Sequence, residues 1–280
     1  MVNKFEKELI KLAIAEDVGD GDHTSLACVP SSAVGKAHLL IKDNGILAGI
    51  RVTKEVFNLI DPELSINIYL EDGRQIKKGD IAFDVEGSSR SILQAERLVL
   101  NFMQRMSGIA SITKNYVDKI KDLDTEILDT RKTTPGLRYF EKEAVRIGGG
   151  TNHRTGLFDM IMIKDNHVDL SGGIEKAINR VQLYFSENNI NLPVEVEARS
   201  ILDVKIILNH GGVNRIMLDN FSIEQTLEAV EIIQKKIETE SSGGITIENI
   251  RDYALCGVDF ISVGALTHQI LSLDMSLKAI

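Results

Sequence analysis

Residues 194–220 read VEVEARSILDVKIILNHGGVNRIMLDN, and this stretch contains two short apolar runs separated by a helix-length interval. The runs are Val194–Val196 and Arg215–Leu218, and each is followed directly by an acidic residue, Glu197 or Asp219. A strand, a helix and a second strand in this order are typical of a βα unit in a parallel sheet. The stretch therefore predicts a fold in which polar side chains stand at the carboxyl ends of buried strands.

Four further apolar runs continue this alternation after about residue 122. They are residues 127–128, 160–163, 237–239 and 260–263, and each is followed by cations, serines or glycines. In an α/β barrel the carboxyl ends of all strands meet on one face, so these distant residues would become neighbours. The total is six strands, with residues 148–153 as a candidate seventh. Because a full barrel has about eight strands, we predict an incomplete TIM-like α/β barrel.

The N-terminal part of the chain has a different texture. Short β-type runs at residues 38–41, 66–70 and 81–85 alternate with glycine turns and with an expected helix over residues 51–60. A helix over Phe5–Ala15 should lead into a polar loop at residues 16–24, and a long helix should begin at Ser88 or Ser89, with Gly108 as a candidate break. We predict an α/β protein with an N-terminal mixed α/β sandwich domain, residues 1–108, joined by the C-terminal segment 268–280. The barrel, residues 109–267, should follow it and carry the active site.

Composition excludes several classes of protein. The chain has 280 residues, a net charge of -9 and no basic tail, so nucleic acid is not an expected partner. No apolar run is long enough to predict a membrane span. The two cysteines, Cys28 and Cys256, fit no metal or redox spacing and the N-terminus lacks a signal-like segment, so we expect a cytoplasmic protein. The absence of Walker and Rossmann glycine motifs argues against a nucleotide triphosphatase and a dinucleotide-dependent dehydrogenase.

Cations are concentrated between Asp129 and His167. This segment holds seven Lys or Arg against five Asp or Glu, a balance of +2 in a chain whose net charge is -9. Guanidinium and ammonium groups bind carboxylate and phosphate oxygens directly, so the segment predicts a pocket for a small polyanion. A single surface cation is usually just solvated, but these cations stand at strand ends beside glycines. The candidate anion ligands are Arg131, Lys132, Arg138, His153, Arg154 and Lys164.

Carboxylates and glycine loops supply the other half of the predicted site. Glu195 and Glu197 alternate along one expected strand, so both side chains point to the same face. Buried carboxylates need a partner, which Lys164 or a divalent cation could supply, and Asp219 would complete a cluster suited to Mg²⁺. For Glu195 a structural ion pair with an arginine is an equally good explanation. Two glycine loops are candidate phosphate sites: Ser242, Gly243 and Gly244, and then Ser262, Val263 and Gly264.

Several strings of residues, taken together, point to a known enzyme family. They are EDVGDGDHT at 16–24, NFMQRMSG at 101–108, DTRKTTPGLR at 129–138, GGGTNHR at 148–154, IKDNH at 163–167, VEVE at 194–197, LDN at 218–220 and SGG at 242–244. The string at 129–138 is the most specific of them. In this order, over nearly the whole chain, they resemble quinolinate phosphoribosyltransferase, also called carboxylating nicotinate-nucleotide pyrophosphorylase.

The resemblance implies an enzyme of de novo NAD biosynthesis. Such an enzyme joins quinolinate, a pyridine dicarboxylate, to the ribosyl carbon of phosphoribosyl pyrophosphate and releases pyrophosphate and CO₂, giving nicotinate mononucleotide. It implies Mg²⁺ as the cofactor and a homodimer, or a higher oligomer, in which Arg105 completes the neighbour's site. By position, the quinolinate ligands should be Arg105, Arg131, His153, Arg154 and Lys164. Lys132, Glu197 and Asp219 should act in catalysis and bind the phosphoribosyl group, the two carboxylates should also bind Mg²⁺ directly or indirectly, and the two glycine loops should hold the sugar phosphate.

Two other functions fit the residues less well. A related transferase could act on nicotinate or another aromatic acid, but the five cations assigned to the acceptor favour a dicarboxylate. A non-catalytic anion-binding module could retain the cationic pocket. Such a module would gain nothing from Glu197 and Asp219 beside its ligand, because carboxylates repel a bound anion.

Overall fold

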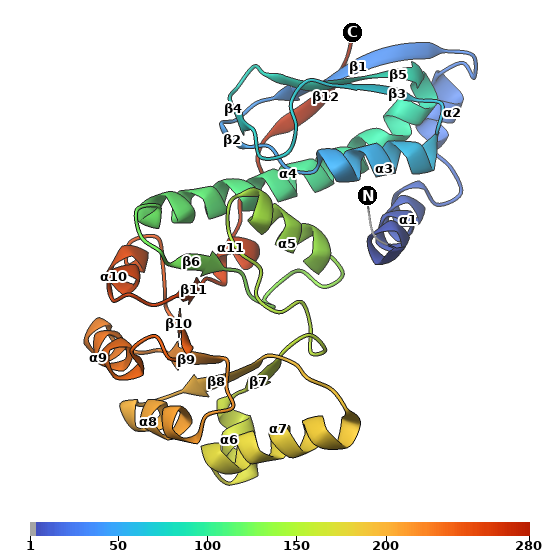
Figure 1. Cartoon of the computed structure of the whole chain (residues 1–280). Helices are drawn as coiled ribbons and strands as arrows, with labels where there is room; N and C mark the ends of the chain where they lie inside the picture. Colours follow the sequence, from blue (N-terminus) through green and yellow to red (C-terminus); the bar gives the residue numbers. More distant parts are fainter. Residues whose placement is uncertain (1–3) are drawn as a thin grey trace. The chain divides into compact units, whose positions relative to one another are not determined.

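The computed structural model describes residues 4–280, which form two compact units (Figure 1). Unit 1 consists of the chain up to Lys114 together with residues 134–149 and 269–280. Unit 2 consists of residues 115–133 and 150–268. Within the described residues no helix is long and apolar enough to cross a membrane. Each unit has its own main sheet.

Unit 1 is built around a four-stranded antiparallel sheet in the order β12, β1, β5, β3. The strands are β1 (Val34–Ile41), β3 (Ser65–Ile68), β5 (Ile81–Ser88) and β12 (Met275–Ala279), and a two-stranded sheet pairs β2 (Gly45–Ile46) with β4 (Gln75–Ile76). Because β12 pairs with β1, the C-terminal segment completes the main sheet. Helix α3 (Ile50–Ile60) packs on this sheet through Phe57, whose ring centroid lies 6.0 Å from that of Phe83 in β5.

The first two helices cover part of the segment that the sequence analysis assigns to a polar loop. Helix α1 covers Lys4–Val18 and helix α2 covers His23–Cys28, so the expected polar loop at residues 16–24 shortens to the turn between them. The cause is a side-chain cap. The Asp22 carboxylate accepts a hydrogen bond of 3.0 Å from the backbone N–H of Ser25, which satisfies a donor at the start of α2.

Helix α4 covers Ser89–Ile120 and is not broken at Gly108, contrary to the expectation. Gly108 serves a close approach instead, because a Cβ there would lie 2.2 Å from the carbonyl oxygen of Leu271. The expected domain boundary at residue 108 therefore falls inside a helix. Residues 134–149 also belong to unit 1 and not to the barrel, since α5 (Arg138–Ile147) packs Phe140 against Phe102 of α4 with ring centroids 4.9 Å apart.

Unit 2 is an open barrel-like sheet of six parallel strands in the order β6, β11, β10, β9, β8, β7. The strands are β6 (Glu126–Leu128), β7 (Ile161–Ile163), β8 (Val194–Ala198), β9 (Arg215–Asp219), β10 (Glu238–Ser242) and β11 (Phe260–Ser262). The helices are α6 (Asp165–Ser171), α7 (Ile174–Asn188), α8 (Ile201–His210), α9 (Ile223–Ile233), α10 (Ile250–Leu255) and α11 (Ala265–His268). The prediction of an incomplete barrel is confirmed. The candidate seventh strand forms an isolated bridge between Thr151 and Leu128.

The strand register stacks the polar side chains of unit 2 in rows. Glu195 pairs in register with Arg215 and Arg215 with Glu238; Glu197 pairs with Met217 and Met217 with Glu240; Asp219 pairs with Ser242. Since side chains alternate between the two faces of a strand, residues two apart point to the same side. The three rows therefore share one face of the sheet and approach its carboxyl edge in succession.

Candidate active site

A pocket of about 390 Å³ lies at the carboxyl ends of the unit 2 strands. It is lined by Thr130, Arg131, Lys132, His153, Arg154, Met162, Lys164, Glu197, Met217, Asp219, Glu240, Ser242 and Ser262. Most of these side chains are at or just after the end of a strand, as a barrel requires. The volume suits a small-molecule ligand. The fold thus brings together most of the cations and carboxylates that the sequence singles out.

Three cations reach the pocket from the β6 side. Arg131 and Lys132 follow β6, and the Thr267 hydroxyl donates a 2.7 Å hydrogen bond to the carbonyl of Lys132. Arg154 is only 9% exposed, and its Nη1 donates to the carbonyl oxygen of Met160 at 3.1 Å. Burial, and then the Arg131 guanidinium, lower the pKa of Arg154. Mutually repelling cations in a partly buried site are stabilised by an anionic ligand.

Lys164 and Glu197 form an ion pair across the ends of β7 and β8. The backbone N–H of Asp165 also lies 3.4 Å from the second oxygen of Glu197. The sequence analysis offers Lys164 or a divalent cation as the partner of a buried carboxylate. In the structure Glu197 pairs with Lys164. A ligand carboxylate that drew Lys164 away would therefore release the charge of Glu197 toward the pocket.

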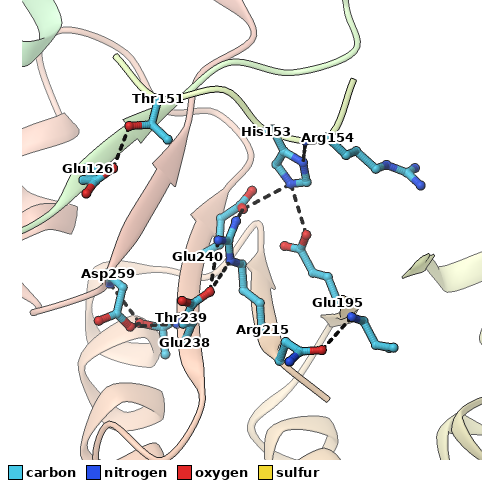
Figure 2. Close-up of polar contacts among 12 residues, drawn as sticks. Glu126, Thr151, His153, Arg154, Glu195, Arg215, Glu238, Thr239, Glu240 and Asp259 are labelled. Atoms are coloured by element: carbon cyan, nitrogen blue, oxygen red, sulfur yellow. Dashed lines mark hydrogen bonds and ion pairs between the residues drawn. The ribbon is translucent and has the colours of Figure 1, made fainter. Parts of the chain in front are cut away.

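His153 is buried at the floor of the pocket, with both ring nitrogens engaged by the protein. The N–H of Arg154 donates to Nδ1 at 2.6 Å. Nε2 lies 3.1 Å from an oxygen of Glu195 and 3.3 Å from an oxygen of Glu240 (Figure 2). Burial opposes a positive charge here, but the two carboxylates outweigh it and raise the pKa of His153 to about 9. The Arg154 N–H works against a second ring proton, but a neutral donor is weaker than two carboxylates.

Four charged side chains, His153, Glu195, Glu240 and Arg215, form what we call the floor cluster (Figure 2). Both carboxylates are fully buried. Burial, and then repulsion by Glu240, raise the pKa of Glu195 to about 6. Burial also works against the charge of Glu240, but the pKa of Glu240 is lowered because His153 outweighs it, with help from Arg215. The cluster thus pairs two cations with two buried carboxylates, Arg215 also pairs with the more exposed Glu238, and the partner of Glu195 is a histidine.

The glycine loops adjoin the pocket through Ser242 and Ser262. Gly243 and Gly244 have φ values of 93° and 62°, which favour glycine. A Cβ on Gly243 would lie 2.2 Å from Oδ1 of Asn220, so the loops after β9 and β10 approach too closely for any other residue. In the second loop, the N–H of Val263 donates to the carbonyl of Leu128 at 3.0 Å and is not available to a phosphate.

Arg105, which the sequence analysis groups with the quinolinate ligands, lies in unit 1 on α4. It lines a different cavity, of about 190 Å³, within that unit. Its Nε and Nη2 donate to one oxygen of Glu141 at 2.8 and 2.6 Å, and Nη2 also donates to the hydroxyl of Thr134 at 2.7 Å. Glu141 is 1% exposed, so this arginine is the charge partner of a buried carboxylate. Arg138 also lies in unit 1, at the start of α5.

Glu240 and Arg215 are the site residues that the sequence analysis missed. Glu238 and Glu240 alternate on β10 as Glu195 and Glu197 do on β8, and that signal was available. It was overlooked because the expected strand at residues 237–239 ends before Glu240, whereas β10 continues to Ser242.

Known proteins resemble this chain along its whole length. Family models of the quinolinate phosphoribosyl transferase N-terminal and C-terminal domains match residues 22–107 and 109–278. The mitochondrial quinolinate phosphoribosyltransferase (decarboxylating) 2b of Nicotiana tabacum is 45% identical, over 97% of this chain and 81% of its own length. A probable nicotinate-nucleotide pyrophosphorylase (carboxylating) of Bacillus subtilis is 40% identical, over 97% and 92%. The crystal structure of NadC from Streptococcus pyogenes has a TM-score of 0.92 at 40% identity, and the match covers 98% of this chain and 96% of that one.

Proposed function

The chain belongs to the quinolinate phosphoribosyltransferase family, and from this membership we propose how its pocket binds and converts two polyanionic substrates. It is a nicotinate-nucleotide pyrophosphorylase (carboxylating): it transfers the phosphoribosyl group to quinolinate with decarboxylation, a step of NAD synthesis. The observation that carries the substrate assignment is that four cations meet Glu197 and Asp219 in one pocket; the cations are Arg131, Lys132, Arg154 and Lys164.

We propose that Arg131, Arg154 and Lys164 bind the two carboxylates of quinolinate. Guanidinium groups match a carboxylate with two donors, and an ammonium adds a mobile point charge. His153 adds positive charge from the floor of the pocket, and Arg105 is proposed to come from a partner subunit. The support is the buried position of Arg154, whose own pKa is lowered by burial and then by the neighbouring Arg131.

The phosphoribosyl pyrophosphate is proposed to lie along Lys132 and the two glycine loops. A Cβ on Gly264 would be 3.2 Å from Cδ of Lys132, so the second loop and the lysine are adjacent. Ser242 and Ser262 line the same pocket and offer hydroxyls to the sugar phosphate. Glycine in both loops keeps the backbone accessible to its oxygens.

Mg²⁺ is the proposed cofactor, and the residues present fit it. Glu197 and Asp219 stand on the neighbouring strands β8 and β9 and both line the pocket. Mg²⁺ prefers one or two carboxylates together with substrate phosphate oxygens. When bound, the ion would neutralise negative charge on the pyrophosphate.

The chain's own residues position the substrates and balance charge. When Lys164 turns to a quinolinate carboxylate, Glu197 is freed to face the ribosyl carbon, where positive charge develops as pyrophosphate leaves. Lys132 stabilises the negative charge on the leaving group. After ribosylation, the positive pyridine nitrogen stabilises the carbanion left when the adjacent carboxylate departs as CO₂, and that carbon then takes a proton from water to give the product. The remaining carboxylate must then be held, which is the role proposed for Arg131 and Arg154.

The proposed assembly is a homodimer in which Arg105 completes the neighbour's pocket. The support is that the Arg105 side chain is 30% exposed on the otherwise largely apolar stretch 98–106 of helix α4, where a neighbouring subunit could reach it. Mixing inactive Arg105→Ala and Lys164→Ala proteins, with subunit exchange, should restore about a quarter of the wild-type activity, because half of the dimers then carry one intact site. No recovery despite exchange would contradict the shared site. A cytoplasmic location is also proposed, since Cys28 and Cys256 are both free thiols.

The experiment that tests the function combines the purified protein with quinolinate, phosphoribosyl pyrophosphate and Mg²⁺. Nicotinate mononucleotide and CO₂ are measured together, and nicotinate replaces quinolinate in the control. Equal amounts of both products from quinolinate alone are expected. Turnover with nicotinate only would favour the sister transferase. Substrate binding without turnover would favour the non-catalytic module.

A further inference from the structure

The segment that carries His153 and Arg154 is held by backbone bonds at Thr151 and by side-chain bonds beyond it. Its link to the sheet is the isolated bridge at Thr151, whose N–H donates to the carbonyl of Ile127 at 2.7 Å. Beyond that bridge, hydrogen bonds to side chains hold the segment. The Asp129 carboxylate accepts a 2.9 Å hydrogen bond from the N–H of His153 and a 2.6 Å bond from the side-chain amide of Asn152. The geometry of this end of the pocket therefore depends on side-chain bonds.

The His153 ring ties this segment to the strands beneath it. Its Nδ1 lies 2.6 Å from the backbone nitrogen of Arg154, and its Nε2 faces Glu195 of β8 and Glu240 of β10 at 3.1 and 3.3 Å. A buried ring that faces two carboxylates cannot rotate freely, so it fixes the backbone where Arg154 begins. Without the carboxylates, Nε2 would lose both of its negatively charged neighbours in a site that is almost closed to water.

An arginine on β9 binds the Glu240 carboxylate in turn. Arg215 of β9 donates through Nη1 to Glu240 at 3.2 Å and through Nη2 to Glu238 at 3.0 Å. The ring of Phe260 lies 3.8 Å from the guanidinium carbon, which stacks the arginine in one orientation. A continuous chain of charged groups thus runs from Arg215 through Glu240 to His153 at the floor of the pocket (Figure 2).

We propose that Glu195, Glu240 and Arg215 are positioning residues for quinolinate: they hold His153, and through it Arg154, at the acceptor end of the pocket. The inference rests on the proposed assignment of Arg154 to quinolinate. The three residues touch neither substrate in this scheme. Their loss should therefore affect the acceptor and spare phosphoribosyl pyrophosphate, whose proposed ligands are Lys132 and the glycine loops.

A metal site is the rival explanation of the same side chains. His153, Glu195 and Glu240 present ligand atoms that all lie within 4.8 Å of one another. However, a divalent cation would be needed only if the two carboxylates lacked a counter-charge, and Arg215 with the protonated ring of His153 supplies it. The charge balance favours a network of ion pairs.

The test compares Glu195→Gln and Glu240→Gln with Glu238→Gln. The first two keep the side-chain shape and remove a floor carboxylate, whereas Glu238, 54% exposed, shares Arg215 but lies outside the floor cluster. Glu195→Gln and Glu240→Gln should raise the KM for quinolinate about tenfold, the scale of losing a charged hydrogen bond, with the KM for phosphoribosyl pyrophosphate within about twofold. Glu238→Gln should leave both constants near wild type. Arg215→Lys is a milder second variant, because it keeps the positive charge but cannot donate to Glu240 and Glu238 together, as the guanidinium does. It should raise the quinolinate KM about threefold.

Three results would overturn the proposal. One is an unchanged quinolinate KM in any folded variant that lacks a floor carboxylate. A second is an equal rise in both KM values, which would mean general structural damage. The third is stoichiometric uptake of Zn²⁺ or Mg²⁺ by the wild type, without substrates, that Glu240→Gln abolishes. An Arg154→Ala variant distinguishes failure of the proposed quinolinate site from failure of the positioning role. If Arg154→Ala binds quinolinate normally, Arg154 is not a quinolinate ligand. If Arg154→Ala loses quinolinate binding but the floor-cluster variants keep it, the floor cluster does not position Arg154.

Discussion

The free energy of unfolding should depend on pH through His153, and replacing Glu240 with glutamine should remove most of this dependence. The pKa of His153 rises from an ordinary value of 6.5 to about 9 in the folded chain. At about 1.4 kcal/mol for each pKa unit, this difference corresponds to about 3 kcal/mol. Because the folded pKa is the higher one, the stabilisation is complete below about pH 6.5 and is lost as the pH rises through about 9.

The groups that face the His153 ring set the size of the effect. They are Glu195 from β8, Arg215 from β9, Glu240 from β10, Asp129 after β6 and the adjacent Arg154. The two carboxylates act at similar distances, and burial opposes both of them. Removing one carboxylate leaves the full burial penalty in place. Glu240→Gln should therefore lower the pKa of His153 by more than half of its rise.

The assay is the free energy of urea unfolding at 25 °C, measured from pH 6.5 to 9.5 for wild type and Glu240→Gln. The absolute stabilities will differ, so the comparison is between the slopes against pH. Groups remote from Glu240, such as Cys256, are common to both proteins and cancel. Glu195 does not cancel, because burial and then Glu240 raise its pKa to about 6, so the comparison uses the slopes above about pH 7.5. The ¹⁵N shifts of the His153 ring, assigned with a His153→Asn variant, report the pKa directly. Parallel stability curves, or a His153 pKa that is the same in both proteins, would refute the electrostatic reasoning.

Three further predictions concern the pocket and helix α4. Arg131→Ala and Lys164→Ala should each lower kcat/KM for quinolinate at least about a hundredfold, the scale of losing one preorganised charged contact; near-normal turnover in both would remove them from the site. Gly243→Ala should raise the KM for phosphoribosyl pyrophosphate about tenfold, and Gly244→Ala, where a Cβ meets nothing within 4 Å, should do less; equal effects would contradict the close approach at Gly243. Gly108→Ala should lower the free energy of unfolding by about 1–3 kcal/mol through overpacking, although alanine is the better helix former; an unchanged or raised melting temperature would contradict the contact that a Cβ would make there.

Local signals predicted much of the barrel. The apolar runs at 127–128, 194–196, 215–218 and 260–263 each fall within or almost within an observed strand, because a short buried strand between helices needs such a run. The expected end of the strand near residue 239 was wrong by several residues, since Glu240 and Ser241 are buried polar residues that hydropathy alone assigns to a loop. The expected helix break at Gly108 was also wrong, because this glycine allows a close tertiary approach inside a regular helix.

The amino-acid sequence by itself determined the class of the fold, the order of its strands along the chain and the presence of a polyanion pocket at the strand ends. These properties follow from periodicity, turn residues and charge, which act over short stretches of chain. Only the tertiary structure decided which charges become partners. Lys164 meets Glu197 because β7 lies beside β8, and His153 meets both Glu195 and Glu240 because β8 and β10 flank β9 in the sheet. The register of a parallel sheet depends on the packing of the whole unit, so no local pattern could have shown that Glu240 lies under His153.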